Sequence, residues 1–139
     1  MDVATWNVLH DGRVVAIDGA VPETLRLSVE IEYLCNHLPT QAGLLVVTLI
    51  GCDRFEYHSY ESLPMFAPAD VAALRLELLS AELNSGDMRV ECSDGGCGGP
   101  LWLRYNSARV ATVEGQHLAQ IELESASHQY WSDWQQRNA

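Results

Sequence analysis

Cysteine and histidine are the residues of this chain that could act as nucleophiles or bind a metal. Only two of the cysteines, Cys92 and Cys97, lie close together, with four residues between them. No two histidines have the i, i+4 spacing of a zinc-binding helix, and the sequence has no nucleophile elbow, phosphate-binding loop or dinucleotide fingerprint. The full set is Cys35, Cys52, Cys92, Cys97, His10, His37, His58, His117 and His128.

We therefore name no catalytic, cofactor-binding or metal-binding residue. Scattered cysteines in a chain without an export signal are typical of free, buried thiols. A metal site, a redox pair, or a pocket that uses Cys or His remains an alternative, because such sites depend on geometry that spacing does not reveal.

A glycine-rich segment, residues 93–100 (SDGGCGGP), resembles a phosphate-binding loop only in its glycines. Loops that hold phosphate follow a strand and open a helix, whereas this segment joins two expected strands. It has no Lys, and its one charged residue is Asp94. The segment is therefore predicted to be a flexible hairpin loop.

Aromatic and acidic side chains are mixed in residues 53–66 (DRFEYHSYESLPMF), the stretch most suggestive of a binding surface. Aromatic residues are enriched at binding hot spots, and carboxylates beside them could engage a basic partner. The alternative is that Phe55 and Phe66 belong to the core and the carboxylates form a solvated rim. A second acidic surface is expected at Glu30 and Glu32. The candidate partner-binding residues are Asp53, Glu56, Tyr57, His58, Tyr60 and Glu61.

The charge balance narrows the class of partner. The chain has 139 residues, with 8 basic against 19 acidic ones and a formal net charge of −11, and every basic residue is Arg. Because phosphate contacts need clusters of basic residues, this balance disfavours nucleic acids and anionic membranes. A basic protein partner is compatible with it, since opposite charge speeds association. The acidic residues are spread along the chain and do not form a tail.

Length and hydropathy fit one domain spanning residues 1–139. No apolar run approaches the roughly 20 residues that cross a bilayer. The first residues, MDVATWNVLHDG, have no basic segment followed by an apolar one. A cytoplasmic location is therefore expected.

Hydrophobic patterns predict strands in the first half of the chain. An Asp-Gly pair separates the apolar runs at residues 5–10 and 13–18, which indicates a hairpin. Residues 24–35 alternate between apolar and polar side chains, as a strand with one solvated face does. Residues 44–50 are apolar at both odd and even positions, which predicts a central strand buried on both faces.

The second half of the chain is predicted to form a helix, three strands and a terminal helix. Pro68 and Gly86 have the residue types of a helix start and stop, and the apolar residues between them recur at helical spacing. A strand at 88–92 follows, and a second hairpin is expected from 101–105 and 108–114. The last helix is expected at 118–136, with its aromatic residues docked onto the sheet: Tyr130, Trp131 and Trp134.

The order ββββ-α-βββ-α predicts an α+β fold, with an antiparallel sheet of about six or seven strands covered by two helices. The function that we expect is a small cytoplasmic protein-binding module. One concrete form is an immunity or antitoxin protein that occludes a basic toxin, such as a nuclease. The alternatives are a self-associating structural domain, which includes a homo-oligomer, and a ligand-binding domain or enzyme that uses Cys or His in a pocket.

Overall fold

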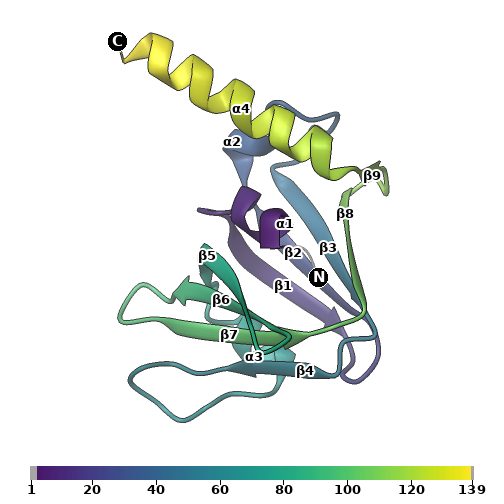
Figure 1. The fold of residues 1–139 in the computed structure, drawn as a ribbon, viewed down its shortest axis with the longest axis vertical. Coiled ribbons are helices and arrows are strands. Elements are labelled where there is room, and N and C mark those ends of the chain that lie inside the picture. Colours follow the sequence, from purple (N-terminus) through teal and green to yellow (C-terminus); the bar gives the residue numbers. More distant parts are fainter. Residues whose placement is uncertain (1–2, 139) are drawn as a thin grey trace.

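The computed structural model describes residues 3–138, which form one nine-stranded antiparallel sheet and four helices (Figure 1). The strand order is β4-β7-β6-β5-β1-β2-β3-β8-β9. The elements are α1 (Val3–Val8), β1 (Arg13–Gly19), β2 (Leu25–Glu30), α2 (Glu32–Cys35), β3 (Leu44–Ile50), β4 (Arg54–Tyr57), α3 (Pro68–Ala72), β5 (Glu77–Asn84), β6 (Asp87–Ser93), β7 (Gly99–Arg104), β8 (Ser107–Thr112), β9 (His117–Leu118) and α4 (Gln120–Arg137).

The sheet is bent into two halves whose strands run in different directions (Figure 1). One half holds β1, β2, β3, β8 and β9, and the other holds β4, β5, β6 and β7. Between β1 and β5 the ladder has a single register pair, Arg13 with Glu77. The chain crosses between the halves twice, from β3 to β4 and from β7 to β8, and these crossings lie side by side because β3 pairs with β8 and β4 with β7.

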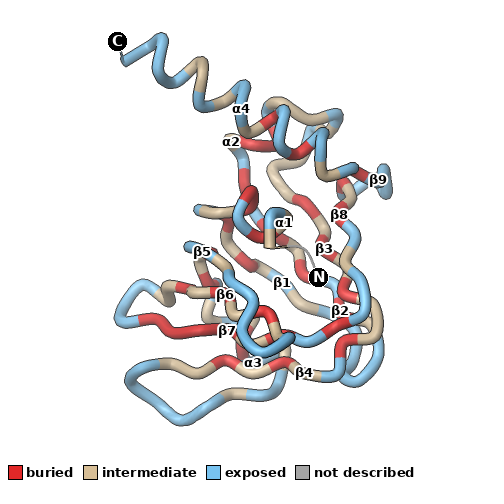
Figure 2. The backbone as a smooth tube through the Cα atoms, viewed as in Figure 1, coloured by how far each residue is buried: buried red, intermediate tan, exposed pale blue. Residues whose placement is uncertain are grey.

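The core lies between the two halves, because alternate residues of each strand face inward (Figure 2). Helix α1 contributes Trp6, which is almost fully buried and whose indole N–H donates a hydrogen bond of 2.8 Å to the Tyr105 hydroxyl. Other fully buried residues come from strands of both halves: Leu25, Leu27, Leu45, Leu49, Leu78, Met88 and Leu101.

The fold class is confirmed in its coarse form, as an antiparallel α+β structure, but the first predicted hairpin is wrong. Residues 5–8 are helical, and only the strand after the turn, β1, is present. Asp11 has a positive φ of 68°, but its N–H donates to the Leu78 carbonyl of β5. The N-terminal segment is therefore attached to β5, which lets Trp6 and Leu9 enter the core at helical spacing.

Two of the predicted strands differ from the structure in extent or burial. The strand expected at 24–35 ends at Glu30, and Glu32–Cys35 is a short helix. β3 is buried on one face only, since Leu45, Val47 and Leu49 are inaccessible while their neighbours are half-buried. The opposite face of β3 is thus part of the molecular surface.

The predicted helix from Pro68 to Gly86 is mostly wrong. Only Pro68–Ala72 is helical, and Arg75 then adopts a φ of +51°, which interrupts a helix. The rest is β5, which pairs with β6 through a turn at Ser85 and Gly86, both with positive φ. Two positive values in a two-residue turn are the geometry that favours a hairpin, so pairing with β6 prevails over the helical spacing.

The second predicted hairpin is also wrong, although both of its strands exist. β7 pairs with β4 and β6, whereas β8 pairs with β3 and β9. Asn106 lies at the bend between the two halves, where its N–H donates to the Ile50 carbonyl at 2.9 Å. The chain therefore passes from one half of the sheet to the other where a tight turn was expected.

The terminal helix is confirmed as α4, but its aromatic residues are not on the sheet. Tyr130 packs on Tyr33 of α2 with ring centroids 4.5 Å apart, and Trp131 stacks on His10 at 6.0 Å. Trp134 is 44% exposed. The C-terminal half of α4 projects away from the rest of the molecule (Figure 1). In residues 3–138 there are nine strands where six or seven were expected, and no long helix covers the sheet. The domain expectation included Met1, Asp2 and Ala139, which lie outside the described residues.

Replacing the buried Trp6 tests this account of the core. Trp6→Phe removes the hydrogen bond to Tyr105 and leaves a cavity, so we expect the free energy of unfolding to fall by about 1–3 kcal/mol. Trp134→Phe, on the exposed end of α4, is the matched control and should change it by less than about 0.5 kcal/mol. Urea unfolding followed by circular dichroism measures both, and equal effects would contradict the assignment.

Candidate functional site

Two loops, residues 58–66 and 94–98, lie together at one end of β4, β6 and β7, and we call them the paired loops (Figure 1). The Tyr60 N–H donates to the Gly98 carbonyl at 2.9 Å, and the His58 N–H donates to the Pro100 carbonyl at 2.9 Å. A Cβ at Gly99, whose φ is +157°, would lie 2.2 Å from the His58 carbonyl oxygen. Glycine at 99 is thus required for the close approach of the two loops.

The first of the paired loops exposes three large side chains. Leu63 is 84% exposed, Phe66 60% and Tyr60 59%. Glu61 lies beside them and contacts the exposed Cys97 of the second loop. Exposed apolar groups that gather on a polar surface are a feature of protein-binding sites. Sequence reasoning included Tyr60 and Glu61 but missed Leu63, whose signal was its place beside Pro64 in a segment without strand or helix periodicity.

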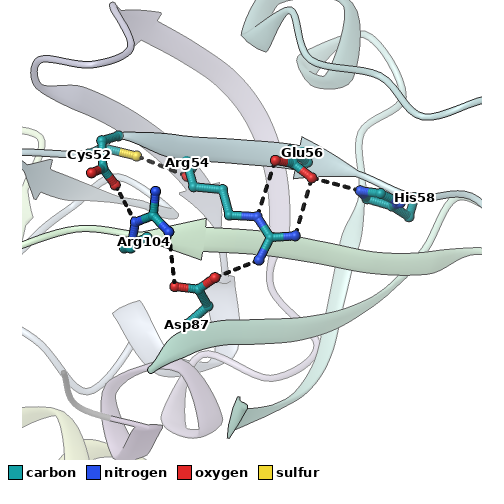
Figure 3. A network of polar contacts seen from close by, with 7 residues as sticks. Cys52, Arg54, Glu56, His58, Asp87 and Arg104 are labelled. Carbon is teal, nitrogen blue, oxygen red and sulfur yellow. Dashed lines mark hydrogen bonds and ion pairs between the residues drawn. The ribbon is translucent and has the colours of Figure 1, made fainter. Parts of the chain in front are cut away.

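A charged network lies on the outer face of β4, β7 and β6, and it extends from the strand ends farthest from the paired loops to His58 (Figure 3). Arg54 donates to both oxygens of Glu56, at 3.1 and 3.2 Å, and also to Asp87. Arg104 donates to Asp53 at 2.7 Å. The guanidinium group of Arg54 also lies 4.8 Å from the ring centroid of Trp102, which is within cation–π range.

These contacts neutralise the carboxylates that the sequence offered to a basic partner. Hydrogen bonds from Arg54, and then from His58, lower the pKa of Glu56 below its ordinary value of 4.5. The hydrogen bond with Glu56 in turn raises the pKa of Arg54. Asp53 is paired with Arg104. The network therefore presents compensated charges, whereas Glu61 has no arginine partner among the described residues.

The six candidate partner-binding residues thus fall into three environments. Asp53, Glu56 and His58 belong to the charged network. Tyr57 is fully buried, and its hydroxyl donates to Asp94 at 3.1 Å. Burial, followed by the neighbouring Asp94, raises the pKa of Tyr57. Only Tyr60 and Glu61 lie at the exposed apolar surface.

All four thiols are free, and none is activated as a nucleophile. Burial raises the pKa of Cys92 to about 12 and that of Cys35 to about 11, and it also raises the pKa of Cys52. Cys97 is exposed, and desolvation together with the Glu61 carboxylate raises its pKa. Because the thiolate is the reactive form, these shifts oppose nucleophilic chemistry. In residues 3–138, no three His, Cys, Asp or Glu side chains are gathered as metal ligands.

Comparisons with known proteins do not assign a family. No protein-family model, curated protein or solved structure matches the chain. Among the helices of residues 3–138, none is long and apolar enough to cross a membrane. The geometry of the described residues is therefore the basis for any functional proposal.

The pH dependence of stability tests the charged network. Since the folded state lowers the pKa of Glu56, its ionised form stabilises the fold above pH 4.5, and this contribution is lost as the pH falls through the lower folded value. Glu56→Gln lacks this contribution. We expect the difference in unfolding free energy between wild type and variant to be largest near neutral pH and to shrink below pH 4.5. Urea unfolding at a series of pH values measures it, and parallel curves would contradict it.

Thiol labelling tests the cysteine assignment. At neutral pH we expect iodoacetamide to modify native protein at Cys97 only, and more slowly than free cysteine, because the other thiols are buried and the pKa of Cys97 is raised. Denatured protein should take up four labels. Mass spectrometry reads the result, with Cys97→Ser as the control that abolishes native labelling. Rapid labelling at Cys92 would instead indicate an activated thiol.

Proposed function

We propose that this chain is a protein-binding module that holds a basic partner protein at the paired loops. The observation that carries the proposal is the exposure of Tyr60, Leu63 and Phe66 on one loop. Large apolar and aromatic side chains of this kind supply most of the binding energy when a partner removes them from water. The loop is held against its neighbour by backbone hydrogen bonds, so part of its ordering is complete before binding.

Charge at the same place supports a basic partner. Glu61 and Asp94 lie on the paired loops, and neither forms an ion pair with arginine among residues 3–138. The net charge of −11 adds a long-range attraction for a positively charged protein. When carboxylates lie on the same loops as apolar anchors, charge sets the association rate and apolar contacts set the lifetime of the complex.

A narrower version of this function is an immunity or antitoxin protein in the cytoplasm that occludes a basic toxin. Its support is the combination of small size, acidity and unactivated thiols. Pairing between copies of the sheet is less favoured, because the β4 edge already bonds to Met65 and β9 is two residues long.

A double substitution on the loop tests the proposal. The wild-type chain is used to isolate and identify a basic partner from its native host, and the dissociation constant is then measured by calorimetry. Leu63→Ser with Phe66→Ser should weaken binding by at least about tenfold, since both anchors are lost. Leu79→Ser with Leu83→Ser is the matched control on β5, where both leucines are also exposed, and should change affinity by less than about twofold.

A second variant separates charge from apolar contact. Glu61→Lys should mainly lower the association rate and weaken its dependence on salt. Full affinity in both the double variant and Glu61→Lys would overturn the placement at the paired loops. Recovery of a second copy of the chain as the sole partner, with dimerisation seen in sedimentation, would overturn the proposed basic partner.

A further inference from the structure

The outer face of β2, β3 and β8 carries a surface of opposite character to the rest of the molecule. A shallow cavity of about 590 Å³ lies there, within the range of small-molecule sites. Its lining contains two of the eight basic residues of the chain and no acidic residue, although acidic residues outnumber basic ones by 19 to 8. The lining includes Arg26, Thr48, Ile50, Arg109, Ala111 and His117.

Strand register brings the basic groups of this cavity together. Arg26 of β2 is directly opposite Thr48 of β3, and Thr48 is directly opposite Arg109 of β8. Opposed residues of an antiparallel sheet share one face, and neighbouring strands are about 4.8 Å apart, so the two arginine backbones are roughly 10 Å apart. The Arg26 guanidinium group donates to Asp18 of β1, which lies on the other side of β2 from Thr48. Other rotamers of this long side chain reach over Thr48 toward Arg109. His117 of β9 is opposite Ala111, which places it diagonal to Arg109 on the same face.

These arginines are poorly compensated within the chain. Arg109 forms no ion pair with any of the described residues. Arg26 has one ion pair, with Asp18 at 3.4 Å, and the side chains of both residues are more than half exposed. By contrast, Arg54, Arg89 and Arg104 each contact more than one carboxylate. Two arginines on one face of the sheet with little opposing charge favour an anion between them, because the anion attracts both guanidinium groups.

We propose that this cavity binds the phosphate group of a small phosphorylated molecule. Each guanidinium group presents a fork of N–H donors that matches two oxygens of a tetrahedral oxyanion. Thr48 lies between the two arginine positions in the strand register, so its hydroxyl can donate to a third oxygen, and the His117 ring can donate from the side. Ile50 and Ala111 supply an apolar floor for the organic part of the ligand.

The geometry favours a small molecule over a nucleic acid. Binding along a phosphate backbone needs a stripe of basic residues, and the lining of this cavity offers two arginines and a histidine. The net charge of −11 on the whole chain repels a polyanion. A single phosphate in a local positive field meets less of that repulsion, because exposed charges beyond about 8–10 Å are screened at physiological salt.

Titration of ¹⁵N-labelled protein with inorganic phosphate, and separately with phenyl phosphate, tests the proposal by NMR. We expect saturable shifts of the amides around Thr48, Arg109 and Ala111, with phenyl phosphate binding more tightly because it also contacts the apolar floor. Arg109→Gln should weaken binding by at least about tenfold, because charge-assisted hydrogen bonds are lost. Arg137→Gln, which removes the same charge at the end of α4, is the control and should leave affinity within about twofold.

Further variants and ligands identify the chemistry that the site recognises. Arg109→Lys keeps the charge but loses the fork, so an affinity between those of Arg109→Gln and wild type supports recognition by the guanidinium group. Equal affinity for acetate and phosphate would overturn the phosphate assignment. Tighter binding of a DNA oligonucleotide than of phenyl phosphate would overturn the small-molecule assignment. Unchanged phosphate affinity in folded Arg109→Gln protein, checked by circular dichroism, would overturn the site itself.

Discussion

The rest of this structure depends on one bend, at which the chain passes from β3 to β4 and, beside it, from β7 to β8. At the bend Gly51 has a φ of +68°, and a Cβ there would lie 2.3 Å from the Asn106 side chain. The Asp53 and Asn106 N–H groups still donate to carbonyls of the paired strand, so the ladder continues through the bend. A single sheet can therefore fold onto itself and enclose a core, with Trp6 of α1 packed into it. The same bend turns the outer faces of the two halves in different directions, so each half carries a surface of its own.

Those surfaces differ mainly in how far their charged side chains are paired with opposite charges, and less in their total charge. On β4, β6 and β7, arginines lie within hydrogen-bonding distance of acidic neighbours, which leaves little unbalanced charge, and Arg54 and Arg89 also lie over the Trp102 ring. On the paired loops, Glu61 lies on the same loop as the exposed apolar side chains and has no arginine partner in the described part of the chain. On β2, β3 and β8 the imbalance is reversed, because Arg109 has no acidic partner among the described residues. A net charge of −11 thus coexists with a basic cavity.

Local sequence patterns correctly predicted those elements whose apolar face meets the core in the folded structure. The alternation after Thr24 and the helical spacing around Leu123 match β2 and α4, because in both cases one face meets the core. The region after Pro68 failed because its apolar residues suit a helix and a strand equally, and only pairing with β6 decides between them. For the candidate site, the sequence identified the stretch from Asp53 to Phe66. It could not separate the buried Tyr57 from the exposed Tyr60, since both belong to one run of aromatic and acidic residues.

By itself the sequence determined the acidity of the chain, the scattered positions of its thiols, and the presence of alternating strands and a terminal helix. Those properties depend on residue type and on neighbours within a few positions. Only the tertiary structure decided which carboxylates are neutralised and that Arg26 and Arg109 flank Thr48 on one face of the sheet. The reason is that Arg26 and Arg109 are 83 residues apart in the sequence and are brought together by a strand order that no local pattern encodes.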